Sequence, residues 1–226
     1  MLLHIPRVLT AEQAAHCKEK LAGADWIDGK VTAGAIAGSA KNNVQVSEKD
    51  LTGRKLSDLI VHALTGNALF LSAAMPLQVS PPIFNRYQDG QSYGGHFDAA
   101  VIQVPGARHR LRTDLAATLF LSATDDYDGG ELTLEGGYGG QRIKLPAGDL
   151  VLYPASSLHH VQAVTRGVRL AAVFWVQSLV RDDDDRQILF DLDIAIQRIR
   201  KANADDTSIL PLTGIYHNLL RRWSET

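Results

Sequence analysis

The residues best suited to chemistry form a short motif, His96-Phe97-Asp98, which follows a stretch rich in tyrosine and glycine. Residues two positions apart in a β-strand point to the same face, so the His96 imidazole and the Asp98 carboxylate would project together. An imidazole and a carboxylate supply two of the three ligands of a facial triad, which leaves positions open on a non-haem iron. The motif alone is weak evidence for a metal site, because His-x-Asp arises often by chance.

A third ligand is expected from a later strand of the same region. His159 and His160 are the candidates, since they follow the apolar run Leu150-Val151-Leu152-Tyr153-Pro154. Only one of two adjacent strand residues can face inward, and the other would be an ordinary exposed or packed histidine. We take His159 as the ligand because Arg169 stands ten residues after it.

Arg169 lies on an apolar segment, residues 168–175. The turn Thr165-Arg166-Gly167 predicts a hairpin that places the Arg169 strand beside the His159 strand. The two side chains would be offset by roughly 10 Å, at about 3.3 Å per residue. This offset suits a short dicarboxylate that chelates iron at one end and pairs with a guanidinium at the other. Alone, Arg169 would be interpreted as a salt-bridged or snorkelling arginine, but its combination with the two histidines and the aspartate favours the dicarboxylate.

The elements that must position these residues are short strands. Residues 81–178 contain many apolar or alternating runs separated by Gly and Asp turns, a texture typical of an all-β sandwich or barrel. No long amphipathic helix interrupts them, which disfavours a doubly wound α/β fold. We therefore predict a mainly β core, 81–178, between an N-terminal helical and edge-strand region, 1–80, and a C-terminal helical extension, 179–226.

Helical segments are predicted on both sides of the core. A capping box at Thr10 and apolar residues at helical spacing predict a helix over about 11–22. Residues 29–43 are interpreted as a strand-and-loop excursion. A second helical segment is predicted over about 48–74, with a break at Gly66-Asn67. After the core, a helix is predicted to begin at the helix-capping carboxylates 182–185 and to carry the apolar stripe Ile188, Leu189, Leu192, Ile196 and Ile199. A last helix is predicted over about 208–222.

Composition limits the classes of function. The chain has 226 residues, of which 45% are hydrophobic, enough for one sizeable globular domain. A net charge of −2 gives no general attraction to nucleic acids. The single cysteine, Cys17, excludes an internal disulfide framework and a Cys-rich metal site, and suits a reducing cytoplasm. The N-terminus lacks the pattern of a signal peptide and no apolar run is long enough to span a membrane, so we expect a soluble cytoplasmic protein.

Together these motifs resemble the Fe(II)/2-oxoglutarate dioxygenase superfamily, in its prolyl/lysyl-hydroxylase-like branch, and most closely the bacterial PKHD-type hydroxylases. The resemblance covers essentially the whole chain. The closing helical segment looks like the C-terminal extension that marks this subgroup. The segments that carry the resemblance are 85–93, 96–98, 118–122, 129–132, 146–150, 159–161 and 167–169.

The resemblance implies a double-stranded β-helix, or jelly roll, with N-terminal helices and a small C-terminal helical extension. It implies that His96, Asp98 and His159 bind Fe(II) and that Arg169 binds the distal carboxylate of 2-oxoglutarate. Tyr87 resembles a tyrosine that helps to hold this cosubstrate in related hydroxylases.

The implied reaction is oxidative decarboxylation of 2-oxoglutarate to succinate and carbon dioxide, coupled to hydroxylation of an unactivated C–H bond. L-Ascorbate is implied as the reductant that rescues the iron. Phe120 stands where some relatives have a second cosubstrate-binding tyrosine, and it lacks the hydroxyl that would make that contact. The substrate is a protein side chain or a small molecule, and the association of some relatives with bacterial iron acquisition points to iron uptake. A homo-oligomer is compatible with all of these features, and neither a nucleic acid nor a membrane is expected as a partner.

Three alternatives stay open. Nucleic-acid demethylases of the same superfamily resemble this chain at the triad but add a second arginine six residues after the first, where this chain has Trp175. A non-enzymatic sensor of iron or 2-oxoglutarate could use the same fold, and succinate formation would distinguish it. A metal-binding jelly roll with isomerase chemistry usually has more than two histidines and would not require Arg169.

The other conspicuous residues are assigned structural roles. The basic segment Arg108–Arg112 is interpreted as a solvated loop between two strands. Phe174 and Trp175 are predicted to pack in the core. No partner is identified in the sequence for the remaining histidines, His4, His16, His62 and His217, which are treated as structural.

Overall fold

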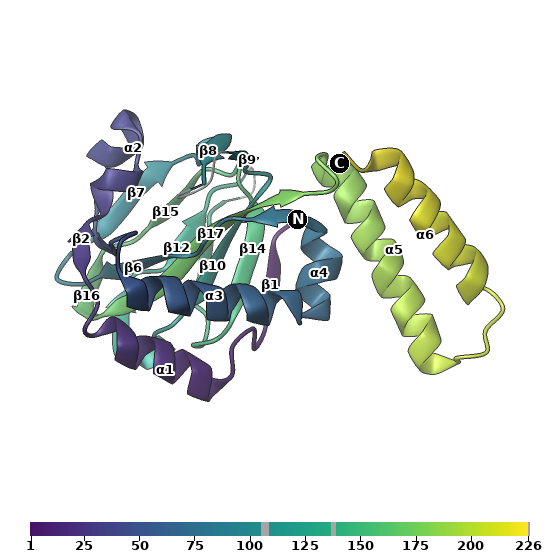
Figure 1. Ribbon diagram of the computed structural model, residues 1–226, viewed down its shortest axis with the longest axis horizontal. Helices are drawn as coiled ribbons and strands as arrows, with labels where there is room; N and C mark the ends of the chain where they lie inside the picture. Colours follow the sequence, from purple (N-terminus) through teal and green to yellow (C-terminus); the bar gives the residue numbers. More distant parts are fainter. Residues whose placement is uncertain (105–108, 137–138, 226) are drawn as a thin grey trace.

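Two antiparallel β-sheets face each other at the centre of the computed structural model, which describes residues 1–104, 109–136 and 139–225 (Figure 1). The major sheet runs β1 (Leu3–Ile5), β14 (Leu150–Pro154), β10 (Leu115–Phe120), β17 (Arg169–Ser178), β6 (Ile83–Tyr87), β4 (Val44–Val46) and β2 (Trp26–Asp28), with β5 (Pro76–Val79) also paired to β17. The minor sheet runs β13 (Gln141–Ile143), β12 (Leu132–Leu134), β15 (His159–Val161), β7 (Ser92–His96) and β3 (Lys41–Asn42). The predicted mainly β, jelly-roll core is confirmed.

Two small ribbons complete the β-structure of the described residues. They are β11 (Tyr127–Gly129) with β16 (Val164–Gly167), and β8 (Val101–Gln103) with β9 (Arg110–Arg112). A short 3-10 helix, η2 (Thr124–Asp126), precedes β11. The basic segment predicted as a loop is therefore partly strand, and Arg108 lies outside the described residues. Arg112 is not free in solvent, because its Nε and Nη1 atoms lie 2.7 Å and 2.8 Å from Asp114 Oδ1 and Glu225 Oε2.

The alternation of side chains along the central strands builds two separate cores. On β10, Leu115, Ala117 and Leu119 belong to the cluster beneath the helices. Ala116 and Phe120 belong instead to a second cluster between the sheets. That second cluster also holds side chains of the minor sheet, so the space between the sheets is apolar at one end and can enclose a cavity.

Helices α1 (Ala11–Leu21), α3 (Leu51–Thr65) and α4 (Ala68–Ala74) cover the outer face of the major sheet, as Figure 1 shows. The capping box predicted at Thr10 begins α1. The predicted break at Gly66-Asn67 is also confirmed, because Gly66 ends α3 and the Asn67 side chain caps α4 by accepting from Phe70 N at 2.9 Å.

The segment 29–43 differs from the predicted strand-and-loop excursion. It forms a 3-10 helix, η1 (Gly29–Thr32), a short helix, α2 (Ala35–Ser39), and then β3. The first of these turns begins because the Asp28 carboxylate accepts from Lys30 N at 2.9 Å. Local side-chain capping therefore favours helical turns here over the predicted strand. These turns place Lys41 at the edge of the minor sheet.

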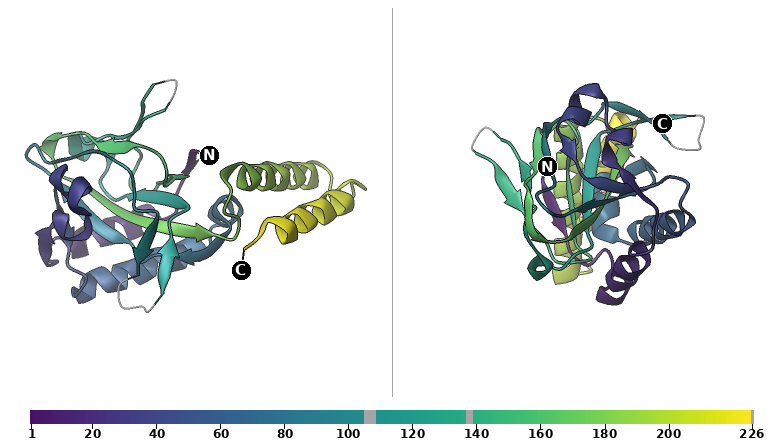
Figure 2. Two further views of the ribbon diagram at one scale, coloured as in Figure 1. Left: turned by 90° about the horizontal axis from the view of Figure 1, so that it is seen from above. Right: turned by 90° about the vertical axis from the view of Figure 1, so that its left-hand side faces the viewer.

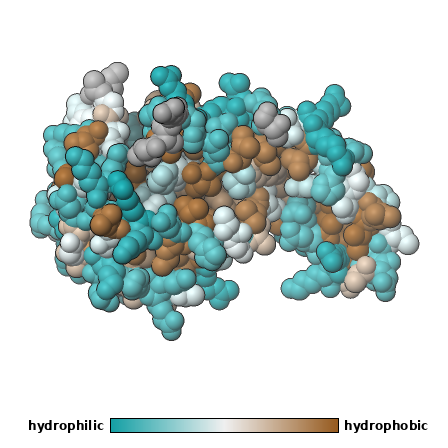
Figure 3. Space-filling model, viewed as in Figure 1, coloured by the Kyte–Doolittle hydropathy of each residue, from teal (hydrophilic) through white to brown (hydrophobic). Residues whose placement is uncertain are grey.

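Helices α5 (Asp183–Ala202) and α6 (Ile209–Trp223) form a hairpin that extends away from the β-core (Figure 2). The predicted capping by carboxylates is confirmed, since Asp182 accepts from the backbone of Asp184 and Asp185. The predicted apolar stripe is wrong for Ile188, which is 49% exposed. Hydrophobic side chains also gather on the surface of the hairpin (Figure 3). Leu210 and Ile215 of α6 are exposed.

Among the described residues, no single helix has both the length and the apolar composition of a membrane span. Only α3 and α4 taken together, with an 84° bend between them, meet that test.

Candidate metal centre and its cavity

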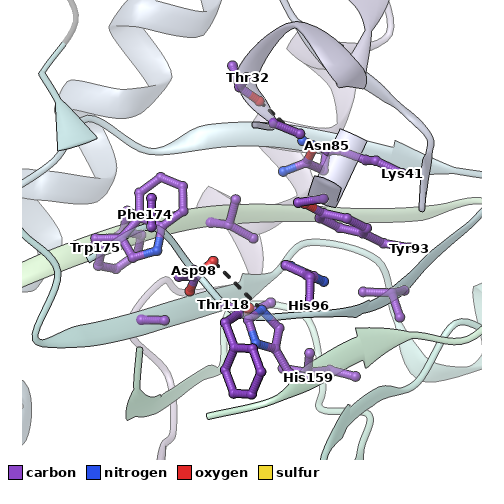
Figure 4. A pocket seen from close by; sticks show the side chains of 18 of the residues that line it. Thr32, Lys41, Asn85, Tyr93, His96, Asp98, Thr118, His159, Phe174 and Trp175 are labelled. Atoms are coloured by element: carbon purple, nitrogen blue, oxygen red, sulfur yellow. Dashed lines mark hydrogen bonds and ion pairs between the residues drawn. The ribbon is translucent and has the colours of Figure 1, made fainter. Parts of the chain in front are cut away.

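The three predicted metal ligands meet at one point between the sheets. His96 ends β7, Asp98 follows two residues later, and His159 lies directly opposite His96 in the β15–β7 register. The two imidazole ring centroids are 4.2 Å apart, and His159 Nε2 lies 3.9 Å from Asp98 Oδ1 (Figure 4). One donor atom from each of the three side chains lies within 4.8 Å of the others. This spacing fits a single metal ion, and His, His and carboxylate is the donor set of a facial triad.

The hydrogen bonds of the two histidines orient their rings toward this point. His96 Nδ1 lies 2.8 Å from Gly94 O, and His159 Nδ1 lies 3.0 Å from Ser157 O. A carbonyl oxygen can only accept, so each Nδ1 carries the proton and each Nε2 keeps a free lone pair. His160 points to the opposite face, where its Nδ1 lies 3.5 Å from Glu135 Oε1.

Burial sets the charge of the cluster. Desolvation, followed by the neighbouring His159, lowers the pKa of His96 to about 4, so this imidazole is neutral near pH 7. Desolvation raises the pKa of Asp98, while His159 and a hydrogen bond from Trp175 lower it. The site thus offers the neutral imidazole of His96 and a buried carboxylate, whose charge a divalent cation would compensate.

A cavity of about 130 Å³ opens beside the three ligands. An engineered cavity of about 150 Å³ suffices to bind benzene, so this volume suits a small organic ligand. Its lining includes Lys41, Asn85, Tyr87, Tyr93, Leu132, Tyr153, Val161, Arg169 and Trp175 besides the three ligands.

Arg169 supplies a buried cation to this cavity. Its side chain is 1% exposed, and its guanidinium carbon lies 5.3 Å and 5.4 Å from the ring centres of Tyr87 and Phe120. Among the described residues, its Nε has no hydrogen-bond partner and no carboxylate forms an ion pair with it. Buried charges are normally paired, so an anionic ligand would supply what the protein does not.

The predicted hairpin between the strands of His159 and Arg169 is wrong. The intervening segment forms β16, which pairs with β11, and β17 then pairs with β10, β6 and β5. Arg169 therefore lies in the major sheet, opposite Tyr87 in register, and faces the metal ligands across the cavity. The chain passes from the minor to the major sheet here because residues 164–167 pair with β11 in a separate two-stranded sheet.

Trp175 was predicted to pack in the core, and it does pack against the cluster between the sheets, but it also lines the cavity. Arg169, Val173 and Trp175 lie at even spacing on β17 and all line the cavity. Phe174 is buried in the core beneath the helices, as predicted, and it borders the cavity as well. The even spacing from Arg169 was the signal for Trp175, but it does not account for Phe174.

Lys41 and His4 are two further departures from the sequence interpretation. Lys41 lines the cavity, and it was missed because its segment was interpreted as a loop excursion. His4 was expected to have no partner, but its Nε2 lies 2.7 Å from Asp149 Oδ2. Arg7 N donates to Asp149 Oδ1 at 2.8 Å, so this aspartate ties down the turn after β1.

Comparison with known proteins identifies the family. Residues 82–177 match the model of the 2OG-Fe(II) oxygenase superfamily, and residues 183–225 match the PKHD-type hydroxylase C-terminal domain. PKHD-type hydroxylases from Burkholderia thailandensis and Saccharophagus degradans are 56% and 53% identical to this chain, over all of both sequences in each case. The chain belongs to the PKHD-type hydroxylase family. It is therefore a 2-oxoglutarate-dependent hydroxylase.

Solved structures agree on the fold of this hydroxylase. A 2OG-Fe(II) oxygenase family oxidoreductase from Burkholderia pseudomallei superimposes with a TM-score of 0.56 and 15% identity, covering 77% of this chain and 84% of that one. A Trichoplax adhaerens prolyl hydroxylase, in complex with a hypoxia inducible factor peptide, also gives 0.56, with 14% identity and coverage of 83% and 86%.

Proposed function

We propose that this hydroxylase binds Fe(II) through His96, Asp98 and His159 and holds 2-oxoglutarate between the iron and Arg169. The observation that carries the proposal is a three-ligand cluster and a buried, unpaired guanidinium in the wall of one cavity. A guanidinium binds a carboxylate through two parallel hydrogen bonds, which suits the distal end of a dicarboxylate.

Bound iron supplies the redox chemistry that couples decarboxylation of 2-oxoglutarate, to succinate and carbon dioxide, to hydroxylation of a C–H bond. The residues of the chain position the reactants. The backbone bonds to Nδ1 orient the two imidazoles. The Trp175 indole nitrogen points toward Asp98 (Figure 4) and would help to orient its carboxylate. The apolar side chains of Leu132 and Val161 help to keep water from the cavity.

Tyr87 is proposed as a second contact to the cosubstrate. Burial raises the pKa of its hydroxyl to about 12, so it stays protonated and can donate to a carboxylate. Phe120 has no hydroxyl, and we assign it only the role of an apolar ring beside the guanidinium. Arg169 and Tyr87 together would hold the distal carboxylate, and the iron would hold the other end.

Fe(II) titration of single variants tests the metal assignment. His96→Ala, Asp98→Ala and His159→Ala should each lose most of their Fe(II) affinity, while circular dichroism shows an intact fold, because these side chains line a cavity rather than fill a core. His160→Ala is the matched control and should keep its affinity, since its ring faces away from the cluster. Unchanged affinity in His96→Ala and Asp98→Ala would remove the assignment, and loss only in His160→Ala would mean the opposite strand register.

The proposal extends to the surroundings of the reaction. L-Ascorbate is proposed as the reductant that returns uncoupled iron to Fe(II), on the resemblance to related hydroxylases.

A cytoplasmic location is supported by Cys17, a buried free thiol whose pKa burial raises to about 11, since such a thiol needs no oxidising compartment. The second substrate is a protein side chain or a small molecule linked to iron uptake, and comparing metabolites and peptides of a deletion strain with its parent would identify it.

A further inference from the structure

A second buried cation, Lys41, reaches the same cavity from β3 at the edge of the minor sheet. Its side chain is 8% exposed. The ammonium donates to Thr32 Oγ1 at 3.1 Å (Figure 4) and to Gln45 Oε1 at 3.4 Å, and both acceptors are neutral. Asp28 and Asp98 act on it only from a distance, and within the described parts of the chain no carboxylate forms an ion pair with it.

An ammonium group has three donors and one positive charge. Two donors are used by neutral oxygens and the Tyr93 ring lies 5.3 Å from the ammonium, so the third donor and an anionic partner for the charge are still missing among the described residues. Lysine is almost never this deeply buried without a partner. Burial lowers the pKa of Lys41 to about 8, which still leaves it mostly protonated at pH 7. An anion from outside the chain would complete its surroundings.

The place of Lys41 separates it from the proposed cosubstrate site. Lys41 lies opposite Tyr93 in the β3–β7 register, and its Nζ lies 5.3 Å from the centre of that ring. The Tyr93 ring in turn stacks on His96, with centroids 3.6 Å apart. One aromatic ring therefore separates the ammonium from a proposed iron ligand, on the minor-sheet side of the cavity, whereas Arg169 belongs to the major sheet. Phe97, which also lines the cavity, is 61% exposed and offers an apolar surface to an incoming molecule.

We propose that Lys41 binds a carboxylate group of the second substrate, so that the compound to be hydroxylated is an acid. Its carboxylate completes the hydrogen bonds of the ammonium, and its apolar part packs near Phe97. This inference rests on the proposed function, because it assumes that Arg169 is occupied by 2-oxoglutarate. The competing possibility is that Lys41 contacts the cosubstrate itself, and the experiment distinguishes the two.

The experiment uses the full chain loaded with Mn(II) in place of iron and saturated with 2-oxoglutarate. Acetate is the probe, acetamide is its neutral counterpart, and the measurement is the paramagnetic relaxation of their methyl protons. Acetate should show saturable relaxation in the parent, and acetamide should not. Lys41→Met should weaken acetate binding by about 10- to 100-fold, the usual range for a hydrogen bond to a charged group, and leave 2-oxoglutarate affinity unchanged. Lys55→Met, an exposed lysine on α3, is the matched control and should behave as the parent.

Lys41→Gln, which keeps a polar side chain, repeats the measurement if the methionine variant does not fold. Saturable binding of acetate that survives both substitutions overturns the proposal, as does the lack of acetate binding in the parent. A loss of 2-oxoglutarate affinity instead assigns Lys41 to the cosubstrate and overturns it too. Failure of the parent to bind Mn(II) and 2-oxoglutarate contradicts the proposed function, which is a separate result. Displacement of acetate by N-acetylglycine indicates a free acid as substrate, and displacement by a blocked aspartyl peptide indicates an acidic protein segment.

Discussion

Replacing Arg169 by leucine should separate cosubstrate binding from metal binding. The substitution removes the charge and the paired donors, yet leaves His96, Asp98 and His159 in place. Truncating one partner of a buried, hydrogen-bonded charge pair costs about 2–5 kcal/mol. At about 1.4 kcal/mol per tenfold, the affinity for 2-oxoglutarate should fall by about 30-fold to a few thousand-fold. Fe(II) affinity should change little.

The same substitution should not destabilise the ligand-free protein. Arg169 is 1% exposed and has no carboxylate partner among the described residues, so its charge is desolvated with only the rings of Tyr87 and Phe120 beside it. Replacing such a group by an apolar one is neutral or stabilising. The free energy of unfolding measured without ligand should therefore stay level or rise. At a hundred times the parental Kd, 2-oxoglutarate should stabilise the parent by about 2.7 kcal/mol but should have little effect on the variant.

The assay is the absorption band of the Fe(II)–2-oxoglutarate complex, titrated without oxygen. Arg169→Lys should be milder but still impaired, because an ammonium keeps the charge and loses the planar pair of donors. Arg166→Leu is the matched control, since Arg166 is exposed on β16 and pairs with Asp128 away from the cavity. If Arg169→Leu binds 2-oxoglutarate as tightly as the parent, the cosubstrate lies elsewhere and the reasoning fails.

Three further substitutions test how the site is supported. Trp175→Phe keeps an aromatic ring but removes the indole N–H, which points toward Asp98 (Figure 4), so Fe(II) affinity by titration should fall about 10- to 100-fold, and an unchanged value would dismiss this positioning role. Gly130→Ala adds a Cβ at a φ of +67°, 2.8 Å from Val164 Cγ2 and 3.0 Å from Arg169 Cδ. Because the added Cβ would displace the Arg169 side chain, 2-oxoglutarate should bind more weakly while Fe(II) binding is retained. Equal loss of both affinities would indicate general misfolding. Arg186→Ala leaves the buried Val180 carbonyl without its hydrogen bond, because the Arg186 guanidinium donates to that oxygen at 2.6 Å. The free energy of unfolding from urea denaturation should fall by about 1–3 kcal/mol, with unchanged Fe(II) affinity. An unfolding midpoint equal to that of the parent would show that this hydrogen bond is dispensable.

Local spacing was enough to predict that His96 and Asp98 come together, although β7 ends at His96 and Asp98 lies two residues beyond it. The choice of His159 over His160 agrees with the cluster in the structure, but it rested on Arg169 and on a hairpin that does not form. The break between α3 and α4 was visible because Asn67 is a strong N-cap residue directly after a glycine. The pairing of His96 with Asp98 and this break each depend on residues close together in the chain.

Predictions that depended on which strands pair were less successful. Neighbouring strands usually form hairpins, and that rule placed Arg169 beside His159, whereas the chain crosses to the other sheet between them. Lys41 was missed for a related reason: its side chain becomes relevant only because β3 pairs with β7 and brings it against Tyr93. Neither pairing is encoded in a local pattern, since both are decided by how the two sheets share the buried surface.

The strand β17 explains why the proposed metal and cosubstrate functions depend on each other. It carries Arg169, which would hold 2-oxoglutarate, and Trp175, whose indole nitrogen points toward Asp98 (Figure 4), on one face of a continuous strand. A slip of one residue in its register would turn both side chains away from the cavity together. That register is fixed on both sides, by six paired residues of β10 and five of β6. These ladders fix where Arg169 stands on the major sheet, whereas His96 and His159 stand on the minor sheet, so the distance between the guanidinium and the candidate metal ligands is set by how the two sheets pack on each other.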